Sequence, residues 1–290
     1  MFLCDQWRDY EVLDTGEGEK LERWGDIVLR RPDPQVIWPK ADPALWGAAQ
    51  ATYVRSDTGG GHWEFREKLP ERWVIGLSGL KFYVKPTGFK HTGLFPEQAA
   101  NWAFMQERIR CAGAWGYPPR VLNLFAYTGG ATLACAAAGA HVTHVDAAKG
   151  MVLWARENRD LSGIPEERTR LIIEDAKAFV RRELRRGNRY DGILMDPPSY
   201  GRGPGGEVWK LENELYPLVD LCAQALSDTP LFFLINGYTT GFSASVLGNI
   251  ARRCLVSRFG GKVEADELCL TVTTGGVLPC GTTARWLPDA

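Results

Sequence analysis

The sequence lacks the long apolar segment that a membrane-spanning helix needs. None of its apolar runs approaches the roughly 20 residues that cross a bilayer. The first residues, MFLCDQWRDYEVLD, have neither the basic nor the apolar region of a secretory signal peptide. The sequence therefore predicts a cytoplasmic protein with no membrane partner.

Metal-binding and disulfide patterns are missing as well. The seven cysteines are odd in number, scattered and without a C-x-x-C pair, and the four histidines show no metal-ligand spacing. These absences argue against a metal site and against a disulfide framework, and they fit a reducing compartment. His141 and His144 lie in an apolar segment, so we expect structural roles for them.

The chain also lacks a strong charge of either sign. Its formal net charge is −1 at pH 7, which gives no overall attraction to nucleic acid, so any RNA binding must come from a local patch. The candidates are six arginines, four of them in FVRRELRRGNR at i and i+4 spacing: Arg181, Arg182, Arg185, Arg186, Arg30 and Arg31. Arginine clusters suit phosphate contacts, although a charged helix face is more often simply solvated.

The order of the segments predicts two domains. Residues 1–92 are rich in Trp, Tyr, Gly and Pro and contain short strand-like pieces, which predicts a small β-rich domain. Residues 93–290 alternate five strand-like with helix-like segments and end in two strands joined by a Gly-containing connection. This alternation predicts an α/β fold with a Rossmann-like, doubly wound, mostly parallel seven-stranded sheet and a C-terminal antiparallel hairpin.

The stretch ILMDPPSYGRG combines a buried strand with a rigid turn. Gly192 to Met195 is a short apolar run without alternation, as expected of a parallel strand covered on both faces. Pro197 and Pro198 end the strand and hold Asp196 at its carboxyl end, where open α/β sheets bind ligands. Taken alone, the stretch also fits a proline-rich turn with a solvated acid.

Further strand ends carry similar residues. In NLFAYTGGATL a strand ends near Phe125, and a loop with Gly129 and Gly130 leads into a helix, so that backbone N–H groups can approach a ligand. The next strand ends in Asp146, where an acid can accept both hydroxyls of a ribose. The strand RLIIED ends in Glu174 and Asp175, and Asp175 is placed to accept a hydrogen bond from the adenine amine. Together with DPPSY these ends predict a site for an adenosine-containing cofactor.

The glycine pattern distinguishes between two cofactors. A nicotinamide dehydrogenase would normally carry G-x-G-x-x-G to hold a pyrophosphate, whereas this loop has only two adjacent glycines. A ligand without phosphates fits better. S-adenosylmethionine (SAM) offers a ribose, an adenine and an amino acid tail to these positions.

Five stretches resemble class I SAM-dependent methyltransferases, in particular the bacterial group that includes large-subunit ribosomal RNA methyltransferases. They are YEVLDTGEGEKLERWG, TGLFPEQAANW, NLFAYTGG, VDAAKGMVLWARENRDLSG and DPPSYGRG, and the resemblance covers nearly the whole chain. It implies the cofactor SAM, an RNA substrate and these cofactor-binding residues: Phe95, Gln98, Phe125, Tyr127, Thr128, Gly129, Asp146, Ala147, Glu174, Asp175 and Ala176. The DPPSY turn supplies the expected catalytic residues: Asp196, Pro197, Pro198 and Tyr200.

The expected chemistry is direct methyl transfer to a base. Asp196 and the carbonyl of Pro197 can accept hydrogen bonds from an exocyclic amine, and Tyr200 can stack on the base, although Ser199 interrupts the usual amine-methylating pattern. Methylation of a pyrimidine carbon would need a thiolate. DPPSYG and INGYTTG contain no cysteine, and Cys280, after a proline in the final hairpin, is expected to be structural. The alternatives are a methyltransferase of a small molecule or protein, and a SAM-binding RNA assembly factor with little catalysis.

Overall fold

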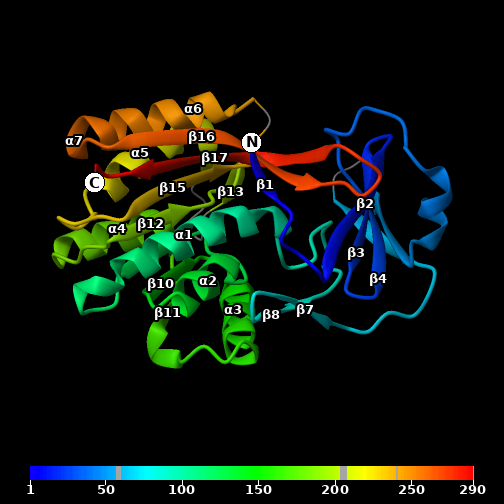
Figure 1. Ribbon diagram of the computed structural model, residues 1–290, viewed down its shortest axis with the longest axis horizontal. Helices are drawn as coiled ribbons and strands as arrows, with labels where there is room; N and C mark the ends of the chain where they lie inside the picture. Colours follow the sequence, from blue (N-terminus) through cyan, green and yellow to red (C-terminus); the bar gives the residue numbers. More distant parts are fainter. Residues whose placement is uncertain (57–59, 203–207, 240, 290) are drawn as a thin grey trace. The chain divides into compact units, whose positions relative to one another are not determined.

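The computed structural model describes residues 1–56, 60–202, 208–239 and 241–289. The chain divides into two compact units (Figure 1). The large unit comprises Met1, Ala100–Leu268 and Gly281–Ala290, and the small unit comprises Phe2–Ala99 and Cys269–Cys280. Within the described residues no helix has the length and apolar character needed to span a bilayer.

The large unit is built on one mixed sheet. Its strands are β9 (Arg120–Leu124), β10 (His141–Asp146), β11 (Thr169–Ile173), β12 (Gly192–Met195), β15 (Phe232–Gly237), β16 (Lys262–Thr271) and β17 (Val277–Leu287). Their order is β16-β17-β15-β12-β9-β10-β11. Strands β15, β12, β9, β10 and β11 run parallel, and β17 is antiparallel to β15. The predicted fold class is confirmed.

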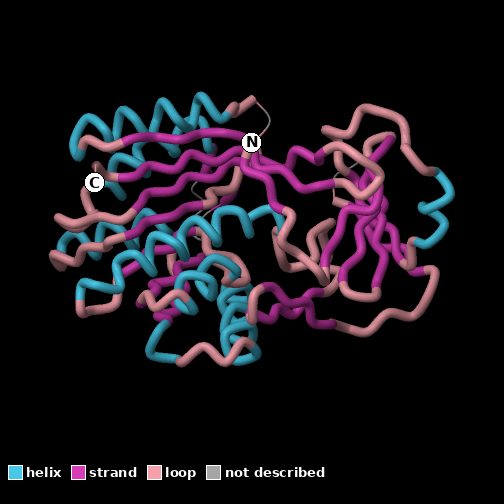
Figure 2. Tube along the Cα trace, in the orientation of Figure 1, coloured by secondary structure: helices cyan, strands magenta, loops and turns pink. Residues whose placement is uncertain are grey.

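Helices lie on both faces of this sheet (Figure 2). They are α1 (Ala99–Cys111), α2 (Gly130–Ala137), α3 (Lys149–Leu161), α4 (Ala176–Arg185), α5 (Leu211–Ala223), α6 (Ala244–Ala251) and the short α7 (Ser257–Phe259). Side chains of α4, α5 and α6 share one buried core with the sheet. Strands β12 and β15 are buried along their whole length, which explains their uninterrupted apolar sequences.

The small unit is β-rich, as predicted. Its five-stranded sheet has the order β2-β3-β4-β5-β6, formed by β2 (Tyr10–Gly16), β3 (Glu19–Trp24), β4 (Ile27–Pro32), β5 (Ala51–Arg55) and β6 (Gly61–Phe65). A hairpin follows, formed by β7 (Trp73–Leu77) and β8 (Leu80–Val84). The unit also takes in Cys269–Cys280 from the C-terminal hairpin. The predicted domain boundary between residues 92 and 93 stays a prediction.

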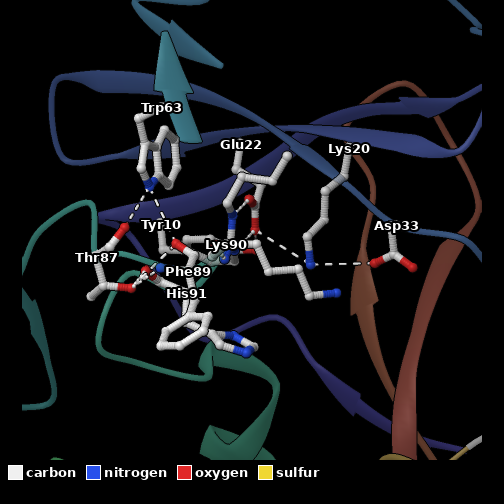
Figure 3. Close-up of polar contacts among 10 residues, drawn as sticks. Tyr10, Lys20, Glu22, Asp33, Trp63, Thr87, Phe89, Lys90 and His91 are labelled. Atoms are coloured by element: carbon white, nitrogen blue, oxygen red, sulfur yellow. Dashed lines mark hydrogen bonds and ion pairs between the residues drawn. The ribbon is translucent and has the colours of Figure 1, made fainter. Parts of the chain in front are cut away.

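A buried ion pair lies inside the small unit. The guanidinium of Arg31 donates to both carboxylate oxygens of Glu22, at 2.6 and 2.7 Å, and the hydroxyl of Tyr10 donates to the same carboxylate at 2.6 Å (Figure 3). Burial works against the charge of Glu22, but Arg31 and Lys20 overcome it and lower the pKa of Glu22 to about 2. Arg31, one of the arginines expected to contact RNA, therefore has a structural partner instead.

Breaking this pair should destabilise the protein strongly. Arg31→Met leaves the Glu22 carboxylate buried without its main partner, and removing one member of a buried pair costs about 3–5 kcal/mol. Urea unfolding at pH 7 measures the loss. The control is Arg23→Met, because Arg23 pairs with Glu11 at 3.0 Å where both side chains are about one-third exposed, and exposed pairs contribute about 0–1 kcal/mol. Equal losses in the two variants would contradict this expectation.

Candidate active site

The register of the parallel strands brings the predicted site segments to one edge. Leu124 at the end of β9 pairs with Met195 of β12 on one side and with Val145 of β10 on the other. Asp146 in turn pairs with Ile173 at the end of β11. The segments that follow β9, β10, β11 and β12 therefore leave the sheet at the same level, at the carboxyl edge where α/β folds bind ligands.

The loop after β9 has an unusual backbone. Phe125 and Tyr127 have φ of 56° and 52°, and Gly129 has φ of 90°. Left-handed backbone costs a non-glycine residue about 1–2 kcal/mol, and such strain is typical of functional sites. Glycine is required at position 129 by its positive φ. It is required at position 130 because a Cβ there would lie 2.5 Å from the ring of Trp102.

Asp146 holds this loop through its carboxylate. One oxygen accepts from the backbone N–H of Tyr127 at 2.9 Å, and the other accepts from that of Ala148 at 2.8 Å. Asp146 is half-buried, and this burial raises the pKa of its carboxyl group although both N–H donors oppose the shift. Ala147, between Asp146 and Ala148, is exposed. An ionised carboxylate has about four acceptor positions, so the arrangement leaves capacity for the hydroxyls of a ribose.

Helices α2 and α3 fix the rest of the loop. The carbonyl of Thr128 accepts from the side-chain amide of Asn158 at 2.9 Å. Below the loop, Thr132 Oγ1 lies 2.9 Å from Nδ1 of His144 and accepts from Asn123 at 2.9 Å. Burial lowers the pKa of His144 to about 3, so this histidine is neutral and has the structural position that we expected. Asn158 was missed by the sequence analysis.

The acids after β11 already have partners within the large unit. Glu174 forms an ion pair with Arg182. Asp175 is the N-cap of α4, where its side chain accepts from the N–H of Ala178 at 2.8 Å, and Ala176 is the first, buried residue of that helix. Their predicted role at the adenine stays a prediction, because a capping carboxylate still has free acceptor positions.

The arginine group on α4 is partly neutralised by its neighbours. Arg182 pairs with Glu174, and Arg186 lies 3.6 Å from the buried carboxylate of Glu183. Arg181 and Arg185 are exposed and form no ion pair within the part of the chain that the structure describes. These two remain candidates for RNA contact in this unit.

The DPPSY turn lies directly beside the end of β9. The N–H of Asp196 donates to the carbonyl of Leu124 at 3.3 Å. The indole of Trp209 donates to the carbonyl of Pro198 at 2.6 Å, and its ring lies 5.5 Å from that of Phe125. Trp209, which sequence reasoning missed, thus connects the turn with the glycine loop.

The remaining residues of the turn differ in exposure. Pro197 is buried, whereas Tyr200 is 53% exposed at the start of β13 (Tyr200–Arg202), which pairs with β14 (Val208–Lys210). Ser199 and Thr239 share a hydrogen bond of 2.6 Å between their hydroxyls. Gly203, the last residue of the DPPSYGRG motif, lies outside the described residues.

Phe95 and Gln98 belong to the small unit. Phe95 precedes the short 3-10 helix η2 (Pro96–Gln98), and its ring lies 5.3 Å from that of His91. The N–H of Gln98 donates to the carbonyl of Phe95 at 3.1 Å. Their predicted contact with the cofactor stays a prediction.

Cys280 also belongs to the small unit. Its thiol donates to the carbonyl of Leu278 at 3.4 Å. Burial, followed by the nearby carboxylate of Glu97, raises the pKa of this thiol well above its usual value. Cys280 is therefore protonated near neutral pH, which disfavours a role as nucleophile.

A family model for S-adenosylmethionine-dependent methyltransferases matches residues 41–218. This match covers more than half of the chain, so the chain belongs to that family of enzymes. The predicted class of enzyme and the predicted cofactor, SAM, are thereby confirmed.

Individual relatives agree with this assignment. The chain is 39% identical to the SAM-dependent methyltransferase from Agrobacterium tumefaciens, whose crystal structure matches with a TM-score of 0.93 over 99% of this chain and 93% of that one. It is 28% identical to ribosomal RNA large subunit methyltransferase K of Neisseria meningitidis serogroup B, over 58% of this chain and 46% of the relative. It is 29% identical to ribosomal RNA large subunit methyltransferase K/L of Pseudomonas paraeruginosa, over 68% and 27%. The chain spans less than half the length of these two curated relatives.

Replacing Asp146 should weaken SAM binding. A hydrogen bond to a charged group contributes about 1.5–3 kcal/mol, so Asp146→Ala should lower the affinity for SAM about ten- to a hundredfold. Titration calorimetry measures the affinity, and thermal melting checks that the variant is folded. The control is Asp160→Ala, since this acid is 61% exposed and pairs with Arg159. Unchanged affinity in folded Asp146→Ala would remove Asp146 from the cofactor site.

Proposed function

We propose that this protein transfers the methyl group of SAM directly to a base of ribosomal RNA. One observation supports the position of the reaction: Asp196 and the glycine loop leave neighbouring strands at the same level and are connected through Trp209. The names of the two curated relatives support ribosomal RNA as the substrate. The predicted cytoplasmic location belongs to the same proposal.

The residues around this edge fit SAM. The carboxylate of Asp146 suits the ribose hydroxyls, and the strained loop from Phe125 to Gly129 suits the amino acid tail, which carries no phosphate. Glu174, Asp175 and Ala176 would border the adenine. Bound here, SAM supplies a methyl group that its sulfonium has already activated.

The turn then has mainly to align the target. Asp196 and the carbonyl of Pro197 would accept hydrogen bonds from the exocyclic amine of a base, which directs the nitrogen lone pair and stabilises developing positive charge. The exposed ring of Tyr200 would stack on the base. Because side chains at a sheet edge cannot reach a base inside a duplex, the target must be unpaired or flipped out.

The raised pKa of the Cys280 thiol favours direct methyl transfer over a covalent intermediate. Attack on a pyrimidine ring needs a thiolate, and burial keeps this thiol protonated.

Two other functions remain as alternatives: methylation of a small molecule or protein, and a role as a SAM-binding RNA assembly factor with little catalysis. Single-turnover methylation with labelled SAM tests them together, using total RNA from cells that lack this protein. Label in large-subunit ribosomal RNA supports the proposal, and label in another fraction or in no RNA contradicts it.

Asp196→Ala should lose most methyl transfer and still bind SAM. Removing one positioned polar group from an active site costs on the order of a hundred- to a thousandfold in rate. The single-turnover rate and calorimetry with SAM give the two readouts. Cys280→Ser is the matched comparison and should remain active. An inactive Cys280→Ser variant, together with a denaturation-resistant adduct between the wild type and fluoropyrimidine RNA, would replace this mechanism by carbon methylation.

A further inference from the structure

The small unit presents a loop, residues 85–92, that side chains of the same unit hold in place. The hydroxyl of Thr87 donates to the carbonyl of His91 at 2.8 Å, which closes the loop on itself. The indole of Trp63 donates to the carbonyls of Thr87 and Phe89 at 2.9 and 3.2 Å (Figure 3). Arg31 donates to the carbonyl of Lys90 at 2.9 Å. The loop is thus held from two sides by side chains of the five-stranded sheet.

Within the described part of the chain, Lys90 on this loop is a half-buried cation without an ion pair. Burial, followed by the neighbouring cation Lys20, lowers the pKa of Lys90, and Arg31 and Arg55 act in the same direction. Asp33 opposes the shift but forms its ion pair with Lys20, at 3.3 Å. Among the described residues no carboxylate lies within 4.0 Å of the Lys90 ammonium, which extends toward Lys20 in Figure 3.

The nearby carboxylates do not compensate this charge. Glu22 is bound by Arg31 and Tyr10, and Asp33 by Lys20. His91 also responds to these cations, because burial and then the charges of Arg31, Lys90 and Lys20 lower its pKa to about 4. Burying a charge without a partner is costly. An anionic ligand that binds at the Lys90 ammonium would remove that cost.

We infer that this loop binds the RNA substrate, with Lys90 holding one backbone phosphate and Phe89 stacking on a base. The inference rests on the proposed function. Phe89 is 68% exposed, and its ring points away from both ammonium groups (Figure 3). Proteins bind single-stranded nucleic acid by stacking bases on exposed aromatic rings that lie next to phosphate-binding cations. The combination of Phe89 with Lys90 therefore favours RNA over an acidic peptide as the ligand.

Removing the Lys90 charge tests the phosphate contact. Filter binding of a large-subunit ribosomal RNA transcript is measured over a salt series. One lost phosphate contact should reduce the slope of log affinity against log salt by about 0.7–0.9, and Lys90→Gln should bind about tenfold more weakly at low salt. Lys90→Arg should retain binding. Lys68→Gln is the matched control, because Lys68 is an exposed lysine of the same unit.

Phe89 tests the stacking contact independently. Phe89→Leu keeps an apolar side chain but removes the ring, so RNA affinity should fall about fivefold or more while the salt slope stays unchanged. Phe89→Trp should retain binding. Ile37→Ala is the control, since Ile37 is another exposed apolar residue of this unit, at 89%.

The outcomes separate this inference from the proposed function. If the wild type methylates no RNA, the proposed function fails. If it methylates RNA and Lys90→Gln keeps both the affinity and the salt slope of the wild type, only the phosphate contact fails, and an unchanged Phe89→Leu removes the stacking contact. If Lys90→Gln loses SAM affinity in calorimetry, the loop serves the cofactor and the inference is wrong.

Discussion

The parallel hydrogen-bond register of β12, β9, β10 and β11 is the constraint on which the site depends. Because Leu124 pairs with both Met195 and Val145, the residues that follow these strands begin at one level. A shift of one residue between β12 and β9 would turn each side chain of the shifted strand to the opposite face. Such a shift would also move the Asp196 turn along β9 and away from the loop at Phe125. Strands with two apolar faces resist it only through detailed packing, so the helices that cover both faces help to hold this register.

In the small unit a buried charge fixes the position of a loop, as the strand register does in the large unit. The Glu22 carboxylate orients Arg31 through Nε and Nη2, and the third nitrogen of Arg31, Nη1, donates to the carbonyl of Lys90. A buried ion pair is weak support for stability, since desolvation offsets much of its attraction. Its clearer effect here is geometric, because a guanidinium that is fixed at two nitrogens positions the loop through the third.

Much of the fold and part of the site could be predicted from the sequence because the signals are local. Prolines after an apolar run mark the end of β12, and an acid at the end of an apolar segment marks Asp146 at the end of β10. What could not be predicted depends on partners distant in sequence. Nothing in EVWKLEN indicates that Trp209 binds a carbonyl eleven residues earlier, and nothing around Asn158 indicates its bond to Thr128. Asp175 shows that a local signal can also be ambiguous. An acid at a strand end is suited to bind a ligand, but it is equally suited to be the N-cap of the helix that follows.

The arginines show why charge alone is a poor guide to RNA contact. Of the cations that the sequence offers, Arg31 and Arg182 are held by Glu22 and Glu174, and their charges are satisfied within the fold. A cation that lacks such a partner gains more from a phosphate, because it does not first give up an existing ion pair. This criterion selects Arg181 and Arg185 in the large unit and Lys90 in the small unit. Of these, only Lys90 is half-buried, so its uncompensated charge is the least screened by water, and a phosphate there is worth more than one at an exposed helix face.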